Sequence, residues 1–511
     1  MRIFLIGSDI GTSGTKSSIV DLKGNVLAQA FEGYPLYTPR AGWAEQNAED
    51  WENAVYKTIR SVVRQSGVSA REIAGICVSG LFAGCGVPVD DNFNPVRNAI
   101  IWMDRRATAQ ADHIERTIGG KRLFALTGNG NDAYFGFNKI LWIRDNEPDI
   151  FTKIALFLPS NSYIVYRLTG EVIIDYTSAA NIGGIYDLRR NRWAFDMMNE
   201  MGIDRNLMPE NFLEPVQIAG TLTRDAARKL DLSPGIPVCA GCTDCLASSI
   251  SAGAIDVGTQ IAVIGTSINW SVLHDKFPPV PELVTMPYAI APKRVYYTYG
   301  GVTAAGALTK WFREIIAPYS MSSDEIVPTS FQMLEEEAEK IPVGSDGLLI
   351  LPYFMGERSP IWDSNARGLV IGLSLHHTRA NIYRAILEAS AFAVKHIMEV
   401  SDLFKGENKE CVVSGGAVHS KLWMQIISDV TGFTLKTVSG DMQAPVGDAL
   451  IAGVAAGVID SFGVIDSWRK YGAAFVPDLD THKKYAEIFE YYKELYENTK
   501  NCMHFLASIC R

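Results

Sequence analysis

The chain has 511 residues, and because single hydrophobic cores stop growing near roughly 250–300 residues, two domains are the default expectation. Apolar residues make up 47% and charged residues 20% of it, which is ordinary for a soluble globular enzyme. The formal net charge of −10 argues against a nucleic-acid partner, which would need a basic face, but leaves nucleotide binding open because a few backbone donors hold phosphates.

Neither a secretion signal nor a membrane span is expected. The apolar run at the N-terminus is too short for a signal peptide and ends at Asp9. No run of about 18 apolar residues follows it. The eight cysteines are few for the length and suit a reducing compartment, so we expect a cytoplasmic protein.

The first half is predicted to open with three short strands and a helix. Alternating apolar residues and tight turns predict strands at 3–8, 17–21 and 26–30. A helix is predicted over 48–66, because Asn47 is a good N-cap and Gly67 a good terminator. A buried strand is predicted at 73–79.

The second half repeats this opening. The tetrapeptide Ile-Gly-Thr-Ser occurs at 10–13 and at 264–267, each time between two predicted strands. The second pair of strands is predicted at 260–264 and 269–273. A repeat in the same structural context predicts a duplicated domain, with domains at 1–253 and 254–511.

The remaining segments alternate between helix and strand, which predicts the α/β class. Helices are predicted over 304–312, 381–400, 422–432 and 482–506, and strands at 347–352 and 412–416.

The turn over 9–14, Asp-Ile-Gly-Thr-Ser-Gly, has the composition of an anion site. Its glycines allow a close backbone approach, and successive N–H groups with the hydroxyls of Thr12 and Ser13 form a concave anion cradle. Asp9 beside it is suited to hold Mg²⁺ through water. An ordinary hairpin turn remains the alternative, although the second copy at Gly265 and Thr266 favours phosphate binding.

Two further turns lie between a strand and a helix. Asp244 follows the apolar segment 237–240, where a carboxylate at a strand end suits chemistry in a crevice between domains. A helix N-cap is the alternative for this aspartate. Gly415 and Gly416, before Ala417, allow a flat base or ribose to approach the backbone, or simply form a tight turn.

Cys239, Cys242 and Cys245 form a cluster with two interpretations. A metal site would need four ligands, and no further Cys or His lies nearby at ligand spacing. A tight glycine-rich turn that requires small side chains is the favoured alternative.

Taken in order, these motifs resemble the FGGY carbohydrate kinases over nearly the whole chain. The segment 9–16 is similar to the first phosphate motif of that family. Segments 356–360, 366–373 and 384–388 resemble its C-terminal signature, and 414–417 its adenosine site. A P-loop and the protein-kinase motifs are absent from the sequence. The resemblance implies two actin-like, ribonuclease H-like domains with a catalytic cleft between them.

The resemblance also implies roles. Asp244 matches the general base that takes the proton of the substrate hydroxyl, and Asp9 matches the carboxylate near Mg²⁺. The residues expected around ATP are Gly11, Thr12, Ser13, Lys16, Gly265, Thr266, Gly301, Gly306, Gly415, Gly416 and Ala417. ATP and Mg²⁺ are therefore the expected cofactors. FGGY enzymes are often dimers or tetramers, and a homodimer is expected here.

The sugar pocket is expected to differ from that of glycerol kinase. That enzyme carries an Arg-Glu pair where this chain has Phe82 and Ala83, so a pentulose such as xylulose is expected before glycerol or another polyol. Asp104 has two interpretations, a contact to a substrate hydroxyl or an ion pair with Arg105 or Arg106. The residues expected around the sugar are Phe82, Ala83, Trp102, Asp104, Tyr134, Asp244 and Cys245.

The activity that this resemblance implies is in-line transfer of the γ-phosphoryl group of ATP to a primary hydroxyl. An actin-like ATPase that works as a switch is the rival from another class, because a fold does not fix a function. The aromatic and acidic residues Trp102, Asp104 and Tyr134 favour a sugar kinase.

Overall fold

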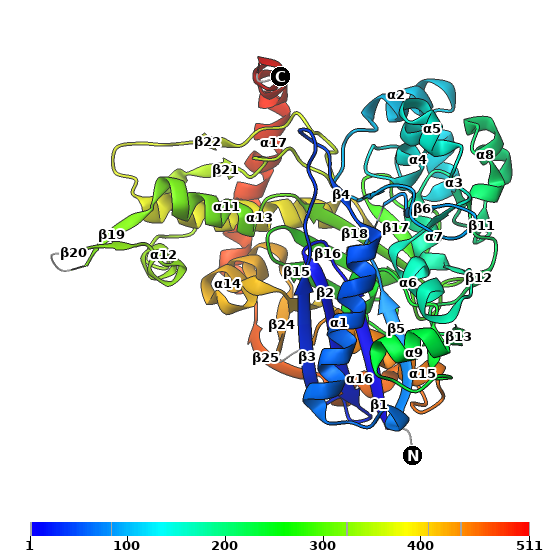
Figure 1. Cartoon of the computed structure of the whole chain (residues 1–511). Coiled ribbons are helices and arrows are strands. Elements are labelled where there is room, and N and C mark those ends of the chain that lie inside the picture. Colours follow the sequence, from blue (N-terminus) through cyan, green and yellow to red (C-terminus); the bar gives the residue numbers. More distant parts are fainter. Residues whose placement is uncertain (1–2, 83, 323–324, 407, 440–441, 510–511) are drawn as a thin grey trace.

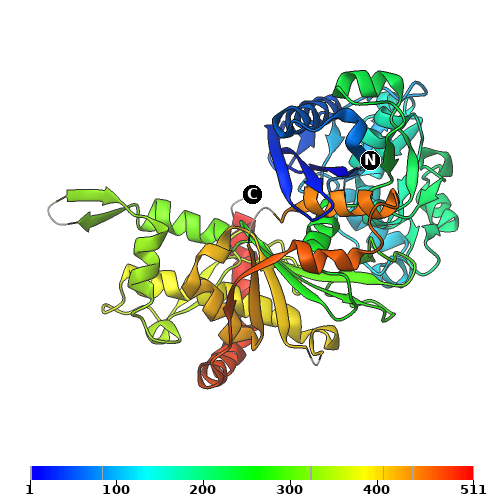
Figure 2. The same ribbon diagram turned by 90° about the horizontal axis from the view of Figure 1, so that it is seen from below.

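The structure, a computed structural model, describes residues 3–82, 84–322, 325–406, 408–439 and 442–509. Two α/β halves lie side by side, each built on one mixed sheet (Figures 1 and 2). The N-terminal sheet has the order β13 (Ile218–Thr221), β14 (Pro237–Cys239), β5 (Ile73–Ser79), β1 (Phe4–Ile10), β2 (Gly14–Asp21), β3 (Val26–Gly33). The C-terminal sheet has the order β17 (Val284–Pro287), β18 (Tyr296–Val302), β16 (Ile268–His274), β15 (Gln260–Ile264), β23 (Glu410–Ser414), β24 (Thr434–Ser439), β25 (Lys470–Phe475).

The two sheets share one topology. In each, the first strand pairs antiparallel with the second and parallel with a strand that follows a helical crossover: β1 with β2 and β5, β15 with β16 and β23. The repeated tetrapeptide occupies equivalent places, at the β1–β2 and β15–β16 turns. This correspondence supports the predicted duplication and brings two glycine-rich turns into equivalent positions.

Helix α1 (Ala48–Ser66) has the predicted bounds. The Asn47 side chain accepts the amide hydrogen of Glu49, and Gly67 ends the helix at φ 67°. Its face with Trp51, Val55 and Ile59 is buried against the N-terminal sheet (Figure 1). The other predicted helices and strands occur within a few residues of their expected bounds, including α13 (Arg379–Glu399) and α17 (Leu479–Ile509).

Helix α15 (Ala444–Ala455) crosses between the halves. Although it comes late in the chain, it packs against β1, β5 and α10 (Asp244–Ser251) of the N-terminal half (Figure 2). A Cβ atom on Gly7 would lie 1.8 Å from the Pro445 carbonyl oxygen, and one on Gly447 would lie 1.9 Å from that of Ala247. Only glycine permits these approaches, so α15 is fixed on two sides.

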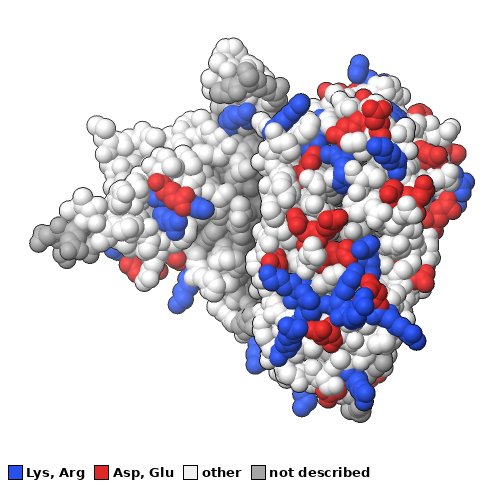
Figure 3. All heavy atoms as spheres, viewed as in Figure 1, with Lys and Arg blue, Asp and Glu red and all other residues white. Residues whose placement is uncertain are grey.

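No helix within the described part of the chain is long and apolar enough to cross a membrane. On the face drawn in Figure 3, acidic and basic side chains are interspersed over the N-terminal half. Some pair directly, as Arg167 does with Glu52 at 2.8 Å and Arg228 with Asp225 at 2.6 Å.

Candidate active site

Two of the predicted carboxylates, near the end of β1 and at the start of α10, repel each other. Asp9 lies near the end of β1, and Asp244 is the first residue of α10, after β14. Burial raises the pKa of Asp244, and repulsion from Asp9 raises it further, while its bond to the Cys245 amide opposes the shift. Burial also raises the pKa of Asp9, against the opposing effects of Ser79 and Lys16. Such mutually perturbed carboxylates are typical of catalytic sites.

Asp244 occupies the first helical position, and Thr243 is the N-cap residue, without a side-chain capping bond. One oxygen of Asp244 accepts the Cys245 amide hydrogen at 2.7 Å. The other oxygen has no hydrogen-bond partner within the described residues, which leaves it available to a ligand. The N-cap position of α10 therefore belongs to Thr243, one residue before Asp244.

Hydrogen bonds to its backbone and to the Thr12 hydroxyl hold the turn between β1 and β2 in place. The Gly11 amide donates to the Gly14 carbonyl at 3.1 Å, and the Tyr34 hydroxyl donates to the Gly11 carbonyl at 2.6 Å. The indole of Trp102 donates to the Thr12 hydroxyl at 3.0 Å. Ser13 is exposed at the tip of the turn.

Lys16 lies directly across the β1–β2 pair from Asp9. Its Nζ donates a hydrogen bond to Oε1 of Gln443, the residue that precedes α15. The lysine therefore joins the N-terminal sheet to the helix that crosses between the halves, beside the carboxylates, and supplies the positive charge that lowers the pKa of Asp9.

A pocket of about 730 Å³ in the C-terminal half brings five predicted nucleotide residues together from three segments. Gly265 and Thr266 come from the second glycine-rich turn, Gly306 begins α11 (Gly306–Trp311), and Gly416 and Ala417 follow β23. A Cβ on Gly306 would lie 2.3 Å from the Gly265 carbonyl, so close packing of the two segments requires glycine. The remaining lining residues, which the sequence interpretation missed, are Thr309, Lys310, Phe331, Gln332, Glu335, Tyr383, His419, Ser420 and Trp423.

Two further predicted glycines of the C-terminal half, Gly301 and Gly415, do not line this pocket. Gly415 has a φ of 101°, and a Cβ there would lie 2.4 Å from the Ile264 carbonyl. Gly301, on β18, makes room for Arg358, whose Nη2 would lie 2.6 Å from an added Cβ. Gly415 therefore shapes the turn, and Gly301 places a cation.

We expect Gly416→Leu to weaken nucleotide binding selectively. Nothing lies within 4 Å of a Cβ at Gly416, whose φ is not in the left-handed region, so leucine fits without strain and its side chain occupies pocket space. The KM for ATP should rise at least about tenfold, equivalent to about 1.4 kcal/mol, with the sugar KM unchanged. Gly406→Leu, at an exposed glycine with equally open surroundings, is the matched control. An unchanged KM for ATP would mean that the nucleotide binds elsewhere.

An aromatic wall lies between the β1–β2 turn and Asp244. Phe82 packs on Tyr134 with ring centroids 5.6 Å apart, and Trp102 on Tyr134 at 6.2 Å. Tyr299 of β18, which the sequence interpretation missed, lies 5.9 Å from Phe82 and extends the wall from the other half. Burial raises the pKa of Tyr134, and nearby Arg358 opposes this shift. Ala83 lies outside the described residues.

Cys245 also borders Asp244. Burial and the negative charge of Asp244 raise the pKa of the Cys245 thiol, which is therefore neutral. It offers a weakly polar surface beside Asp244.

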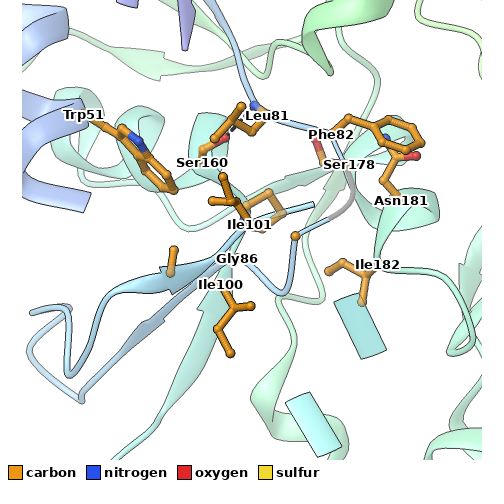
Figure 4. A pocket seen from close by; sticks show the side chains of 13 residues that line it. Trp51, Leu81, Phe82, Gly86, Ile100, Ile101, Ser160, Ser178, Asn181 and Ile182 are labelled. Atoms are coloured by element: carbon orange, nitrogen blue, oxygen red, sulfur yellow. Dashed lines mark hydrogen bonds between the residues drawn. The ribbon is translucent and has the colours of Figure 1, made fainter. Parts of the chain in front are cut away.

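Behind Phe82 a small, mainly apolar cavity lies beneath the loop that carries this residue (Figure 4). Ser160 holds the loop, because its hydroxyl accepts the Leu81 amide hydrogen at 2.9 Å. Ser178 and Asn181 lie beside Phe82 at one end of the cavity, and Trp51 lies at the other. The loop is thus supported from below, which fixes the Phe82 side of the aromatic wall.

Asp104 is fully buried and is taken up by an ion pair, so it does not reach the aromatic wall as a sugar ligand. Both of its oxygens accept hydrogen bonds from the Arg106 guanidinium, at 2.8 to 3.0 Å, and one accepts the Ala44 amide hydrogen at 2.5 Å. Of the two interpretations of Asp104, the ion pair with Arg106 is the one that the geometry favours.

The cysteine cluster has the geometry of a packed turn. Cys239 and Cys242 are fully buried, and Gly241 between them has a φ of 74°, with a Cβ there 2.0 Å from the Val78 carbonyl. Within the described ranges, no group of three or more His, Cys, Asp or Glu side chains is arranged to hold a metal ion. The small-residue interpretation accounts for this segment.

Known proteins and family models match both halves of the chain. The models described as the FGGY family of carbohydrate kinases, N-terminal domain and C-terminal domain, match residues 4–251 and 261–456. A xylulose kinase of Bacillus subtilis (strain 168) is 32% identical over 503 residues, which cover 98% of this chain and 97% of that protein. A gluconokinase of the same strain is 26% identical over 491 residues, covering 96% and 94%. The crystal structure of xylulose kinase from Rhodospirillum rubrum has a TM-score of 0.90 at 28% identity, covering 98% of this chain and 100% of that one.

Proposed function

Because the chain belongs to the FGGY family of carbohydrate kinases, we propose that it transfers the γ-phosphoryl group of ATP to a primary hydroxyl of a pentulose such as xylulose. The observation that best supports this proposal is the hydrogen bond from the Trp102 indole to the Thr12 hydroxyl. It joins the aromatic wall, a surface for the apolar face of a sugar, to the turn suited to phosphates. The xylulose kinases among its relatives support the choice of substrate.

In this mechanism Asp244 accepts the proton of the attacking hydroxyl. The hydroxyl oxygen forms its bond to the γ-phosphorus, the bond to the β–γ bridging oxygen breaks, and ADP leaves. Gly11, Thr12 and Ser13 bind the terminal phosphates through backbone and hydroxyl donors, Lys16 adds positive charge, and the pocket at Gly416 and Ala417 holds the adenosine. Closing of the two halves around the sugar excludes water that would otherwise hydrolyse ATP.

Asp9 is suited to hold Mg²⁺ through water. Its carboxylate stands at the phosphate turn without a cage of further carboxylate, His or Cys ligands among the described residues. Mg²⁺ usually keeps several waters and takes one or two carboxylates with substrate phosphates, so this donor set fits. The ion would neutralise charge that develops on the transferred phosphoryl group.

The test is ADP production with Mg²⁺ and ATP across pentuloses, hexuloses, polyols and aldonates. One pentulose should raise turnover by orders of magnitude over the bare ATPase rate. Gluconate as the preferred acceptor would replace the pentulose assignment, and Arg358 beside Tyr134 is the cation that such an acid would meet. ATP turnover that no compound stimulates would favour the ATPase switch.

We expect kcat/KM for the sugar to rise with pH through the ionisation of Asp244. The base acts only as the carboxylate, and burial with repulsion from Asp9 raises its pKa, so the protonated form persists above the ordinary range of aspartate near about 3.9. The rising limb should therefore lie above that range in a pH profile of kcat/KM. A limb at or below it would contradict the assignment.

As for surroundings and assembly, a homodimer in the cytoplasm is the proposal. The hairpin of β19 (Tyr319–Ser322) and β20 (Glu325–Pro328) projects from the C-terminal half (Figure 2) and exposes 67% of Met321 and 68% of Ile326. An isolated hairpin with apolar side chains gains stability when covered. Light scattering should give twice the chain mass, and Met321→Lys should reduce it.

A further inference from the structure

A third buried carboxylate, Asp448, lies beside the two already described. It belongs to α15, in the part of this helix that packs against β1 and β5, and it is fully buried. The sequence interpretation did not single it out. Burying a carboxylate costs free energy, because removal from water penalises its charged form.

Ser79 connects Asp448 to Asp9. The Ser79 Oγ atom lies 2.7 Å from Oδ2 of Asp448 and 3.1 Å from Oδ1 of Asp9, at the end of β5. A serine hydroxyl carries one hydrogen, so it donates to one of these carboxyl groups and must accept from the other. Both contacts are hydrogen bonds only if one of the two carboxyl groups carries a proton.

Asp448 is the carboxyl group that retains this proton. Burial and repulsion from Asp9 raise the pKa of Asp448 well above its ordinary value, against the opposing bonds to Ser79 and Cys77. Asp9, in contrast, lies directly across the β1–β2 strand pair from the positively charged side chain of Lys16. The Cys77 thiol, at 3.7 Å from Oδ1, is a weak donor, and no cation pairs with Asp448 within the described residues.

We propose that Asp448 is a positioning residue of the kinase: its carboxyl O–H donates to Ser79, and the Ser79 hydroxyl in turn donates to Oδ1 of Asp9. This chain of two hydrogen bonds fixes one oxygen of Asp9 and leaves the other directed to the phosphate turn. The inference rests on the proposed role of Asp9 at the phosphates.

The mounting of α15 makes Asp448 suitable for this role. Pro445 lies three residues before Asp448 and packs closely against Gly7. Gly447 lies one residue before Asp448 and packs closely against Ala247. A displacement of α15 would therefore move Asp448, Ser79 and Asp9 together. The orientation of a carboxylate in the N-terminal sheet is thus set by a helix from the far end of the chain.

The test compares Asp448→Ala with Asp448→Asn. The alanine variant leaves Ser79 without its donor, so kcat should fall about 10–100-fold, the usual cost of losing a partner behind a phosphate- or metal-binding group. The sugar KM should stay unchanged, because no sugar contact is lost. Asparagine has an N–H₂ donor in place of the carboxyl O–H and should restore most of kcat.

Two readouts separate positioning from structure and from failure of the proposed function. A protonated-carboxyl carbonyl band should appear in the infrared difference between the wild type and Asp448→Asn at neutral pH. Asp429→Ala, which removes another buried carboxylate that binds Gln425 and the Asp478 amide, should leave kcat unchanged. Failure of asparagine to restore kcat, or absence of the band, would overturn the inference; absence of sugar kinase activity in the wild type would overturn the proposed function itself.

Discussion

Asp244→Asn should lower kcat about 10²–10⁴-fold and leave the KM values for sugar and ATP nearly unchanged. Asparagine keeps the shape of the side chain and can still meet the Cys245 amide with its carbonyl oxygen, so α10 should remain intact. It cannot accept the proton that the sugar hydroxyl loses. The loss should therefore fall on the chemical step, measured as steady-state ADP production with the acceptor that the panel identifies.

The matched control is Asp256→Asn, the same change at an exposed aspartate shortly after α10. It should leave kcat at the wild-type value. The pH profile supplies an independent check, since the rising limb that belongs to Asp244 should disappear in the Asp244→Asn variant. A variant that kept full turnover would show that another group removes the proton.

Asp104→Ala should destabilise the protein by about 3–5 kcal/mol, the usual cost of leaving a buried charge without its partner. The Arg106 side chain is fully buried and lies 3.7 Å over the Trp43 ring, and its other carboxylate partner among the described residues is Glu45 at 2.7 Å. The loss should appear as a lower thermal midpoint, with an unchanged sugar KM for the folded enzyme.

Glu200→Ala serves as the contrasting control, because Glu200 pairs with Arg122 on the surface at 2.7 Å. Solvent screens such pairs, so its midpoint should stay at the wild-type value. If Asp104→Ala instead raised the sugar KM and left the midpoint unchanged, the carboxylate would be contacting substrate after all.

Local patterns predicted the elements and the two glycine-rich turns because each depends on neighbours in sequence. The start of α1 is set by the Asn47 side chain, which caps the helix locally. The repeated tetrapeptide consists of residues that can turn tightly. The nucleotide pocket was partly predictable for the same reason: Gly265, Gly306 and Gly416 mark close backbone approaches.

The residues that were missed depend on long-range register. Tyr299 lies in an apolar strand, and Asp448 in an apolar helix, where the local pattern indicates only burial. Their part in the site follows from which strand β18 pairs with and from where α15 crosses β1. Asp104 was left open because its partner in the buried network, the Ala44 amide, lies far from it in sequence.

The crossing of α15 and α10 at Gly447 and Ala247 has a mechanical consequence. If the halves rotate to enclose a sugar, this tight crossing is the natural pivot, and points near a pivot move least. Asp244 begins α10 and Asp448 lies next to Gly447, so both carboxyl groups stay nearly stationary while the adenosine pocket swings through the larger arc. The base would then be in place before the substrates meet, and closure would carry ATP toward it.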